Sequence, residues 1–320
     1  MNKILVTGTS VETSLLKPAE DAGFEIVIQP GDLDEDQLIK ALEGCSGIIM
    51  GGEEFVSEKV IVNSPNLKVV SFVGVDYVRY IDTKAAKEHN ITIKNTPGQN
   101  TESVAEFCVA QLISMNRSIY SSITDKDGAF KKKKQLSGSK IGIVGMGAIG
   151  SRVSQMLSLA FNCEIYYTSR TQKPEIEKRD NAKFVDFETL LGSCDSILFS
   201  PSSNKETLGM FNWHSLKSIK NPITIVNIAN PNLLEPASVS IGLQEGKIES
   251  ITYDVFYDEG TPGASAIAKY SPEKVIVTKH IANLTYVAWN AMASKAIENA
   301  ITYLSEQDSN NNTSYRTSLG

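Results

Sequence analysis

Three glycines, Gly145, Gly147 and Gly150, have the residue type and spacing that point most directly to chemistry in this sequence. They follow an apolar run, Ile141–Val144, and open an amphipathic stretch, Ser151–Ala160. Between a strand and a helix, the first glycine permits a tight turn, the second lets the backbone approach a pyrophosphate, and the third lets helix and strand pack closely. A glycine-rich turn without a ligand is the alternative, but this context favours a dinucleotide site.

The start of the expected helix adds to this site. Ala148 and Ile149 lie between the second and third glycines. The first backbone N–H groups of a helix have no acceptor within the helix, and they attract phosphate groups. We therefore expect Ala148 and Ile149 to contact the bound nucleotide.

The end of the next expected strand indicates which dinucleotide binds. An NAD site usually places a carboxylate there for the ribose 2′-hydroxyl. This chain instead has Ser169, Arg170 and Thr171. A hydroxyl beside a guanidinium suits a 2′-phosphate, so the sequence predicts NADP(H) rather than NAD(H). The alternative is that Arg170 is a surface residue that pairs with Glu175 or Glu177.

Short apolar runs alternate with longer amphipathic stretches, a pattern typical of parallel sheets covered by helices. The expected strands of the first part are Lys3–Thr7, Glu25–Gln29, Gly47–Met50, Leu67–Phe72 and Ile91–Lys94. Those of the second part are Ile141–Val144, Glu164–Tyr167, Ser196–Ser200, Thr224–Ile228, Ser250–Asp254 and Val275–Thr278. The expected helices include Glu12–Ala22, Glu35–Leu42, a connector from Thr101 to about Tyr120, and a closing helix over Tyr286–Leu304. The predicted fold class is α/β, with two doubly wound parallel-sheet domains.

A chain of 320 residues fits two such domains. The turn-rich segment Asn95–Asn100 ends the first unit. We expect a flavodoxin-like substrate domain over 1–98 plus 286–306 and a Rossmann dinucleotide-binding domain over 99–285. The tail 307–320 is rich in Ser, Asn and Thr, so it is expected to be disordered. Sites in such sheets form at the carboxyl ends of the strands, so we expect the active site in a cleft between the domains.

The composition excludes several classes of protein. The chain is 41% hydrophobic and 21% charged, as soluble globular proteins are. Its net charge of −6 argues against a nucleic-acid surface, and no stretch approaches the ~20 apolar residues of a membrane span. The start, Met1–Gly8, is expected to be a strand and not a signal peptide. Four cysteines without a CxxC pair indicate a reducing compartment, so a cytoplasmic location and no metal site are expected.

Several segments together resemble the D-isomer-specific 2-hydroxyacid dehydrogenase family. The likeness spans roughly Leu67–Trp289 and is carried by Ile81–Ala86, Asn95–Asn100, Ser103–Glu106, Leu136–Lys140, and Pro201 with Glu206–Met210. The strand end Tyr167–Thr171 is similar to members that use NADPH, such as glyoxylate/hydroxypyruvate reductases. The resemblance implies an oxidoreductase that works with a nicotinamide cofactor on a small-molecule substrate. It also implies a homodimer built largely on the nucleotide domain.

The resemblance also assigns roles position by position. His280 matches the family's catalytic histidine, which protonates the carbonyl oxygen while hydride arrives from nicotinamide. The ordinary pKa of histidine lies near neutrality, which suits this role. Glu259 matches the carboxylate that pairs with the histidine and favours its protonated form. Asp254 matches the residue that binds the nicotinamide carboxamide, and Pro201 and Thr207 match a cofactor-side loop.

A lone histidine is more often structural than catalytic, so the assignment of His280 is weighed against the other two histidines. Only His280 follows an expected strand and has a candidate carboxylate partner. His89 and His214 are expected at the surface.

The family's third group is missing. Its substrate-binding arginine falls at Asn230, and Pro231 follows where glycine is usual. An asparagine cannot supply a bidentate cationic clamp for a carboxylate, and proline removes a backbone donor. The substrate loop Phe72–Tyr80, which contains Gly74, lacks a clean GxG and has inserted residues. Asn230 and Gly74 are the expected substrate-binding residues, but the usual 2-oxo acid does not follow from them.

Three explanations stay open. The substrate is a ketone or imine without the α-carboxylate, and Asn230 binds a neutral group. Alternatively, another cation such as Arg79 or Lys279 anchors an unusual oxo acid. In the third, the protein binds NADP(H) without turnover, as a sensor or interaction protein. The presence of both His280 and Glu259 favours the first two, and the first is preferred.

Overall fold

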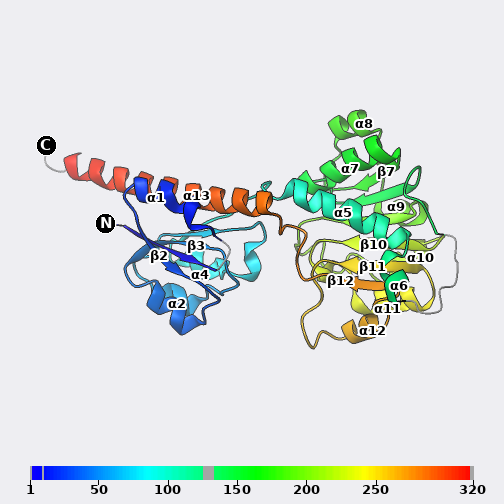
Figure 1. Cartoon of the computed structure of the whole chain (residues 1–320), viewed down its shortest axis with the longest axis horizontal. Helices are drawn as coiled ribbons and strands as arrows, with labels where there is room; N and C mark the ends of the chain where they lie inside the picture. The colour runs from blue at the N-terminus through cyan, green and yellow to red at the C-terminus, as the bar shows by residue number, and fades with distance from the viewer. Residues whose placement is uncertain (1, 9–10, 125–132, 318–320) are drawn as a thin grey trace. The chain divides into compact units, whose positions relative to one another are not determined.

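The computed structural model describes residues 2–8, 11–124 and 133–317. The chain divides into two compact units, one of Met1–Asn100 with Thr285–Gly320 and one of Thr101–Leu284. Each unit has a sheet of parallel strands with helices packed around it (Figure 1). The predicted α/β class with two parallel-sheet domains is confirmed.

The first unit has a five-stranded parallel sheet in the order β2-β1-β3-β4-β5, which is the flavodoxin-like order. Its strands are β1 (Lys3–Thr7), β2 (Glu25–Gln29), β3 (Cys45–Met50), β4 (Val69–Phe72) and β5 (Thr92–Lys94). Its helices are η1 (Thr13–Leu16), α1 (Lys17–Asp21), α2 (Glu35–Ala41), α3 (Glu58–Val62), η2 (Tyr77–Arg79), α4 (Thr83–Glu88) and α13 (Tyr286–Thr317). The central strand β3 is buried along its whole length, as expected for a parallel strand covered on both faces.

The closing helix α13 belongs to the first unit although it lies nearly two hundred positions further along the chain. Its buried face repeats every three or four residues, as a helix packed on a sheet requires. The buried residues on this face are Ala288, Met292, Ala293, Ala296, Ile297, Ala300 and Leu304. Ser71 of β4 donates a hydrogen bond from its hydroxyl to the carbonyl oxygen of Ala296 at 2.7 Å, which fixes the helix on the sheet.

The second unit has a seven-stranded parallel sheet in the order β12-β11-β10-β9-β6-β7-β8. Its strands are β6 (Lys140–Val144), β7 (Glu164–Thr168), β8 (Lys183–Phe184), β9 (Ser196–Phe199), β10 (Ile223–Asn227), β11 (Ile248–Tyr253) and β12 (Val275–Val277). Its helices are α5 (Thr101–Asn116), α6 (Ile119–Thr124), α7 (Ala148–Phe161), α8 (Pro174–Asp180), α9 (Phe187–Ser193), α10 (Trp213–Ser218), η3 (Pro231–Leu233), α11 (Pro236–Gln244) and α12 (Ala264–Ala268). The strand order reverses between β6 and β9, which is where open α/β sheets bind ligands.

Both faces of this second sheet are covered. Successive strand residues point to opposite faces. Ile197 of β9 and Ile225 of β10 lie in one buried cluster, whereas their neighbours Leu198 and Val226 lie in another. The sheet is therefore doubly wound.

The structure differs from the predicted elements at a few places. Pro18 lies at the start of α1, so the helix expected over Glu12–Ala22 is split into η1 and α1. The helix expected to run to about Tyr120 ends at Asn116, because Ser118 adopts a positive φ of 51°. The tail over 307–320 was expected to be disordered, yet α13 continues to Thr317, and no proline or glycine interrupts 305–317. Within the described ranges, no helix is both long and apolar enough to cross a membrane.

Candidate active site

The glycine turn lies at the switch point of the second sheet, at the carboxyl end of β6. Gly145 has a φ of 95°, which favours glycine, and its N–H donates to the carbonyl oxygen of Thr168 at 2.9 Å. A Cβ on Gly145 would lie 2.7 Å from the backbone of Pro201, which follows β9. The turn after β6 and the segment after β9 therefore approach each other so closely that only glycine fits.

Gly147 and Gly150 serve the two other purposes expected of this turn. A Cβ on Gly150 would lie 2.2 Å from the carbonyl oxygen of Gly145, so its lack of a side chain is a packing requirement. A Cβ on Gly147, by contrast, would meet no atom within 4 Å. Gly147 is the N-cap of α7, and Ala148 and Ile149 form the first turn of that helix. The open space beside free helix N–H groups fits a pyrophosphate.

The strand end after β7 presents an exposed cation. Arg170 lies at the surface, and the structure gives it no ion pair among the described residues. Ser169 donates from its hydroxyl to the carbonyl oxygen of the exposed Thr171 at 2.7 Å. Glu177, one of the two carboxylates considered as partners of Arg170, accepts instead from Tyr167 and Gln172. No carboxylate side chain occupies 168–173, the place where an NAD site has one.

The loop after β9 is closed by Thr207. Its hydroxyl accepts from the N–H of Asn204 at 2.9 Å and donates to the carbonyl oxygen of Ser202 at 2.9 Å. Pro201 starts this loop beside Gly145. Both predicted loop residues thus belong to the segment that borders the glycine turn, and Thr207 shapes it.

His280 lies in a loop after β12 that Asp254 holds in place. Asp254 is 2% exposed and follows β11. Its carboxylate accepts from the hydroxyl of Thr278 at 2.7 Å and from the N–H groups of Ile281 at 2.9 Å and Ala282 at 3.2 Å. Its carbonyl oxygen accepts from the N–H of His280 at 2.8 Å. One buried residue therefore binds the backbone of 280–282 and the side chain of Thr278 before it.

This anchoring was missed by sequence reasoning, which assigned Asp254 only to the cofactor. The groups that donate to the Asp254 carboxylate belong to Thr278, Ile281 and Ala282, which lie 24 to 28 positions later in the chain. No local sequence pattern links residues so far apart. Ser103 adds a further tie, since its hydroxyl donates to the carbonyl oxygen of Ala282 at 2.8 Å. The only signal available was the place of Asp254 directly after an apolar strand.

The predicted pairing of His280 with Glu259 is absent from the structure. Both side chains are exposed, and no hydrogen bond or ion pair joins them in the described part of the chain. Glu259 lines a pocket of about 420 Å³ that is formed by residues of the segment Phe256–Ala268. His280 has a φ of 54°, in the left-handed region that side-chain-bearing residues rarely adopt. His89 and His214 are exposed.

Asn230 uses the oxygen of its side-chain amide to form a turn. Its side-chain oxygen accepts from the N–H of Asn232 at 2.9 Å and so caps the short helix η3. Pro231 occupies the first position of that helix, where its missing N–H costs nothing. The side-chain NH₂ of Asn230 is the group that the turn leaves for a ligand, and it carries no charge.

Gly74, the other predicted substrate-binding residue, lies in the first unit after β4. A Cβ there would lie 2.5 Å from the ring of Phe72. Its carbonyl oxygen accepts from the N–H of Thr96 at 2.8 Å and from the Thr96 hydroxyl at 3.1 Å. The described residues hold no group of three or more His, Cys, Asp or Glu side chains suited to a metal ion.

Comparison with known proteins identifies the family of this chain. The family described as D-isomer specific 2-hydroxyacid dehydrogenase, NAD binding domain, matches residues 108–282. A provisionally named 2-hydroxyacid dehydrogenase of Staphylococcus haemolyticus is 30% identical over 309 residues, which cover 93% of this chain and 95% of the relative. A similarly named protein of Staphylococcus aureus is 29% identical and covers 94% and 95%.

Solved structures give the same result for the fold. A protein of Thermus thermophilus has a TM-score of 0.82 at 27% identity, over 95% of this chain and 97% of that chain. A glyoxylate reductase from Paecilomyes thermophila has a TM-score of 0.79 at 23% identity, over 93% and 94%, which shows the shared fold alone. The resemblance drawn from the sequence is confirmed: the chain belongs to the D-isomer specific 2-hydroxyacid dehydrogenase family, whose members are NAD(P)-dependent oxidoreductases acting on CH–OH and C=O groups.

Proposed function

We propose that this protein is an NADP(H)-dependent reductase of a small carbonyl or imine compound that lacks the α-carboxylate of ordinary 2-oxo acids. The observation that carries the cofactor choice is Arg170, an exposed guanidinium without a carboxylate partner in the described structure, directly after Ser169. The observation that carries the substrate choice is Asn230, whose free NH₂ group is neutral.

The residues present fit a dinucleotide. The turn Gly145–Gly150 would hold the pyrophosphate, Ser169 and Arg170 the 2′-phosphate, and the segment from Pro201 to Thr207 would border the bound molecule. When bound, NADPH supplies a hydride to the carbonyl carbon.

The chain's own residues would complete the reaction with a proton. His280 would donate the proton of its imidazolium to the carbonyl oxygen, which gives the alcohol and leaves a neutral imidazole that solvent reprotonates. Asn230 would orient the substrate through its NH₂ group. Glu259 is proposed from the family resemblance as the group that favours the protonated imidazole.

Titration of both cofactors tests the nucleotide part of this proposal. Wild-type protein is expected to bind NADPH more tightly than NADH in isothermal titration calorimetry. Arg170→Ala should weaken NADPH binding about tenfold or more, the worth of a charge-assisted hydrogen bond, and leave NADH within about twofold. Lys178→Ala, which removes an exposed cation on α8, is the matched control. Tighter binding of NADH by the wild type would contradict the proposal.

Asn230→Arg tests the substrate part. If the missing cationic clamp is what excludes ordinary oxo acids, this variant should raise kcat/KM for glyoxylate or hydroxypyruvate about tenfold with NADPH. Asn232→Arg, exposed in the same turn, controls for added charge. Substantial glyoxylate turnover by the wild type would favour the alternative anchor by another cation such as Lys279. If kcat/KM for these oxo acids does not rise in Asn230→Arg, the loop around Gly74 is what excludes them.

Two further parts of the proposal concern assembly and location. A homodimer built largely on the nucleotide unit is supported by the family resemblance. A cytoplasmic location is supported by the four cysteines, which are all buried free thiols.

A further inference from the structure

The loop between β7 and α8 carries Ser169 and Arg170, the residues proposed above to discriminate between the cofactors, and one buried phenol bonds to its end. Tyr167 has no exposed surface, although it is the second-last residue of β7. Its hydroxyl accepts from the N–H of Lys173 at 2.7 Å and donates to Oε1 of Glu177 at 2.9 Å. Burial raises the pKa of Tyr167 to about 12, so the phenol stays a neutral donor over the working pH range.

Both carboxylate oxygens of Glu177 accept hydrogen bonds in this loop. Besides the Tyr167 hydroxyl, the side-chain Nε2 of Gln172 donates to both carboxylate oxygens of Glu177 at 3.0 Å. Gln172 lies two residues after Arg170 in the same short loop. Arg170 is exposed and lies seven residues before Glu177, so it is a candidate partner for the carboxylate if the present donors are removed.

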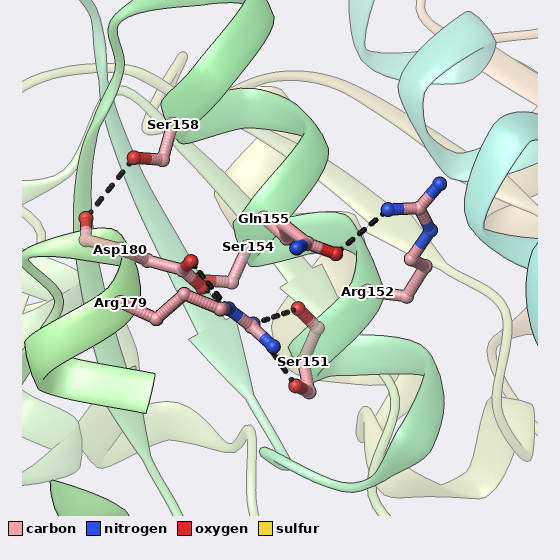
Figure 2. Close-up of polar contacts among 7 residues, drawn as sticks. All are labelled: Ser151, Arg152, Ser154, Gln155, Ser158, Arg179 and Asp180. Carbon is pink, nitrogen blue, oxygen red and sulfur yellow. Dashed lines mark hydrogen bonds and ion pairs between the residues drawn. The ribbon is translucent and has the colours of Figure 1, made fainter. Parts of the chain in front are cut away.

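Among the described residues, two neighbouring arginines, unlike Arg170, are paired with carboxylates. Arg179 binds Asp180, and its Nη2 also donates to the carbonyl oxygen of Ser151 at 2.9 Å (Figure 2). Arg152 binds Glu102 through two hydrogen bonds of 2.7 Å. Both guanidinium groups thus have a carboxylate partner, whereas Arg170 has none in the described structure.

Helix α8, which carries Glu177, is itself fixed to α7. The buried carboxylate of Asp180 accepts from the hydroxyl of Ser154 at 2.6 Å, and its carbonyl oxygen accepts from the hydroxyl of Ser158 at 3.1 Å (Figure 2). We therefore expect the helix to keep its place when the loop before it changes. The position of the Glu177 carboxylate then depends on its own partners, Tyr167 and Gln172.

We propose that Tyr167 is a positioning residue for cofactor choice: it holds the Glu177 carboxylate away from Arg170, so that the guanidinium stays available to the 2′-phosphate. This inference rests on the proposed preference for NADP(H). Without the phenolic hydroxyl, Glu177 would pair with Arg170 and compete with the phosphate for it. NADH has no 2′-phosphate, so its binding would not depend on Tyr167.

The test compares dissociation constants of NADPH and NADH in the full-length protein. Tyr167→Phe should weaken NADPH binding about fivefold, the scale of one competing exposed ion pair, and leave NADH within about twofold. Tyr166→Phe, on the same strand, is the matched control, because the Tyr166 hydroxyl contacts Glu164 and Lys183 instead. The decisive variant is Tyr167→Phe with Glu177→Gln, which should restore NADPH affinity to within about twofold of the wild type.

The outcomes separate this inference from the proposed cofactor preference. If wild-type protein does not prefer NADPH, the cofactor proposal fails and the inference with it. If the wild type prefers NADPH but the double variant stays as weak as Tyr167→Phe, or both cofactors weaken equally, the loop has merely loosened and the inference alone is overturned. Should Tyr167→Phe not fold, Glu177→Gln alone tests the same point. Because Tyr167 already holds the carboxylate away from Arg170, NADPH affinity should stay within about twofold of the wild type. Clearly tighter NADPH binding in that variant would overturn the inference.

Discussion

His280→Ala is expected to lower kcat for carbonyl reduction by about 10³-fold, the usual contribution of a positioned general acid. The side chain makes no hydrogen bond in the described structure, and the loop is held through backbone groups by Asp254. Removing the imidazole should therefore leave the loop and the NADPH affinity unchanged. The loss of NADPH absorbance in single-turnover experiments, with any substrate that the wild type reduces, measures the effect.

The control for this variant is His214→Ala, since His214 is exposed on α10. Its kcat should match the wild type. Unchanged turnover in His280→Ala would remove His280 from the reaction. A weaker NADPH affinity with the same kcat would instead indicate a binding role.

Gly147→Val is expected to weaken both NADPH and NADH by more than about 100-fold while the protein still folds. The new side chain would meet no atom of the protein near its Cβ, so it would fill the space through which the pyrophosphate reaches the N-terminus of α7. Calorimetric titration gives the affinities, and the thermal unfolding midpoint should stay within a few degrees of the wild type.

Gly147→Ala serves as the graded control and should lose less affinity than valine, because it adds only one methyl group. Equal NADPH affinity in all three proteins would show that the dinucleotide does not pass Gly147. A large fall in the unfolding midpoint would show that the glycine is needed for packing, as Gly150 is.

The sheets could be predicted from the sequence because parallel strands buried on both faces are short, nearly continuous apolar runs. All strands were expected except β8, whose two residues Lys183 and Phe184 are both exposed and give no such run. Helix ends were harder to predict, because single residues decide them. Pro18 splits the first helix and Ser118, with its positive φ, ends α5.

The candidate site was predictable where the binding residues lie in one short segment of the chain. The glycine turn and Arg170 depend on residues next to each other in the chain. The ties of Asp254 to 278–282 and of Tyr167 to Glu177 depend on the fold, and the sequence shows no pattern for them. Glu259 was matched to His280 by resemblance, and the described structure shows no contact between them.

The left-handed backbone of His280 also bears on the cost of having a histidine at this position. A residue with a side chain costs about 1 kcal/mol or more in that conformation, and glycine or asparagine would relieve it. If the imidazole had no use, nothing in this exposed loop would offset that cost. The presence of histidine at a position where stability alone favours glycine is what the proposed acid role of its imidazole would require.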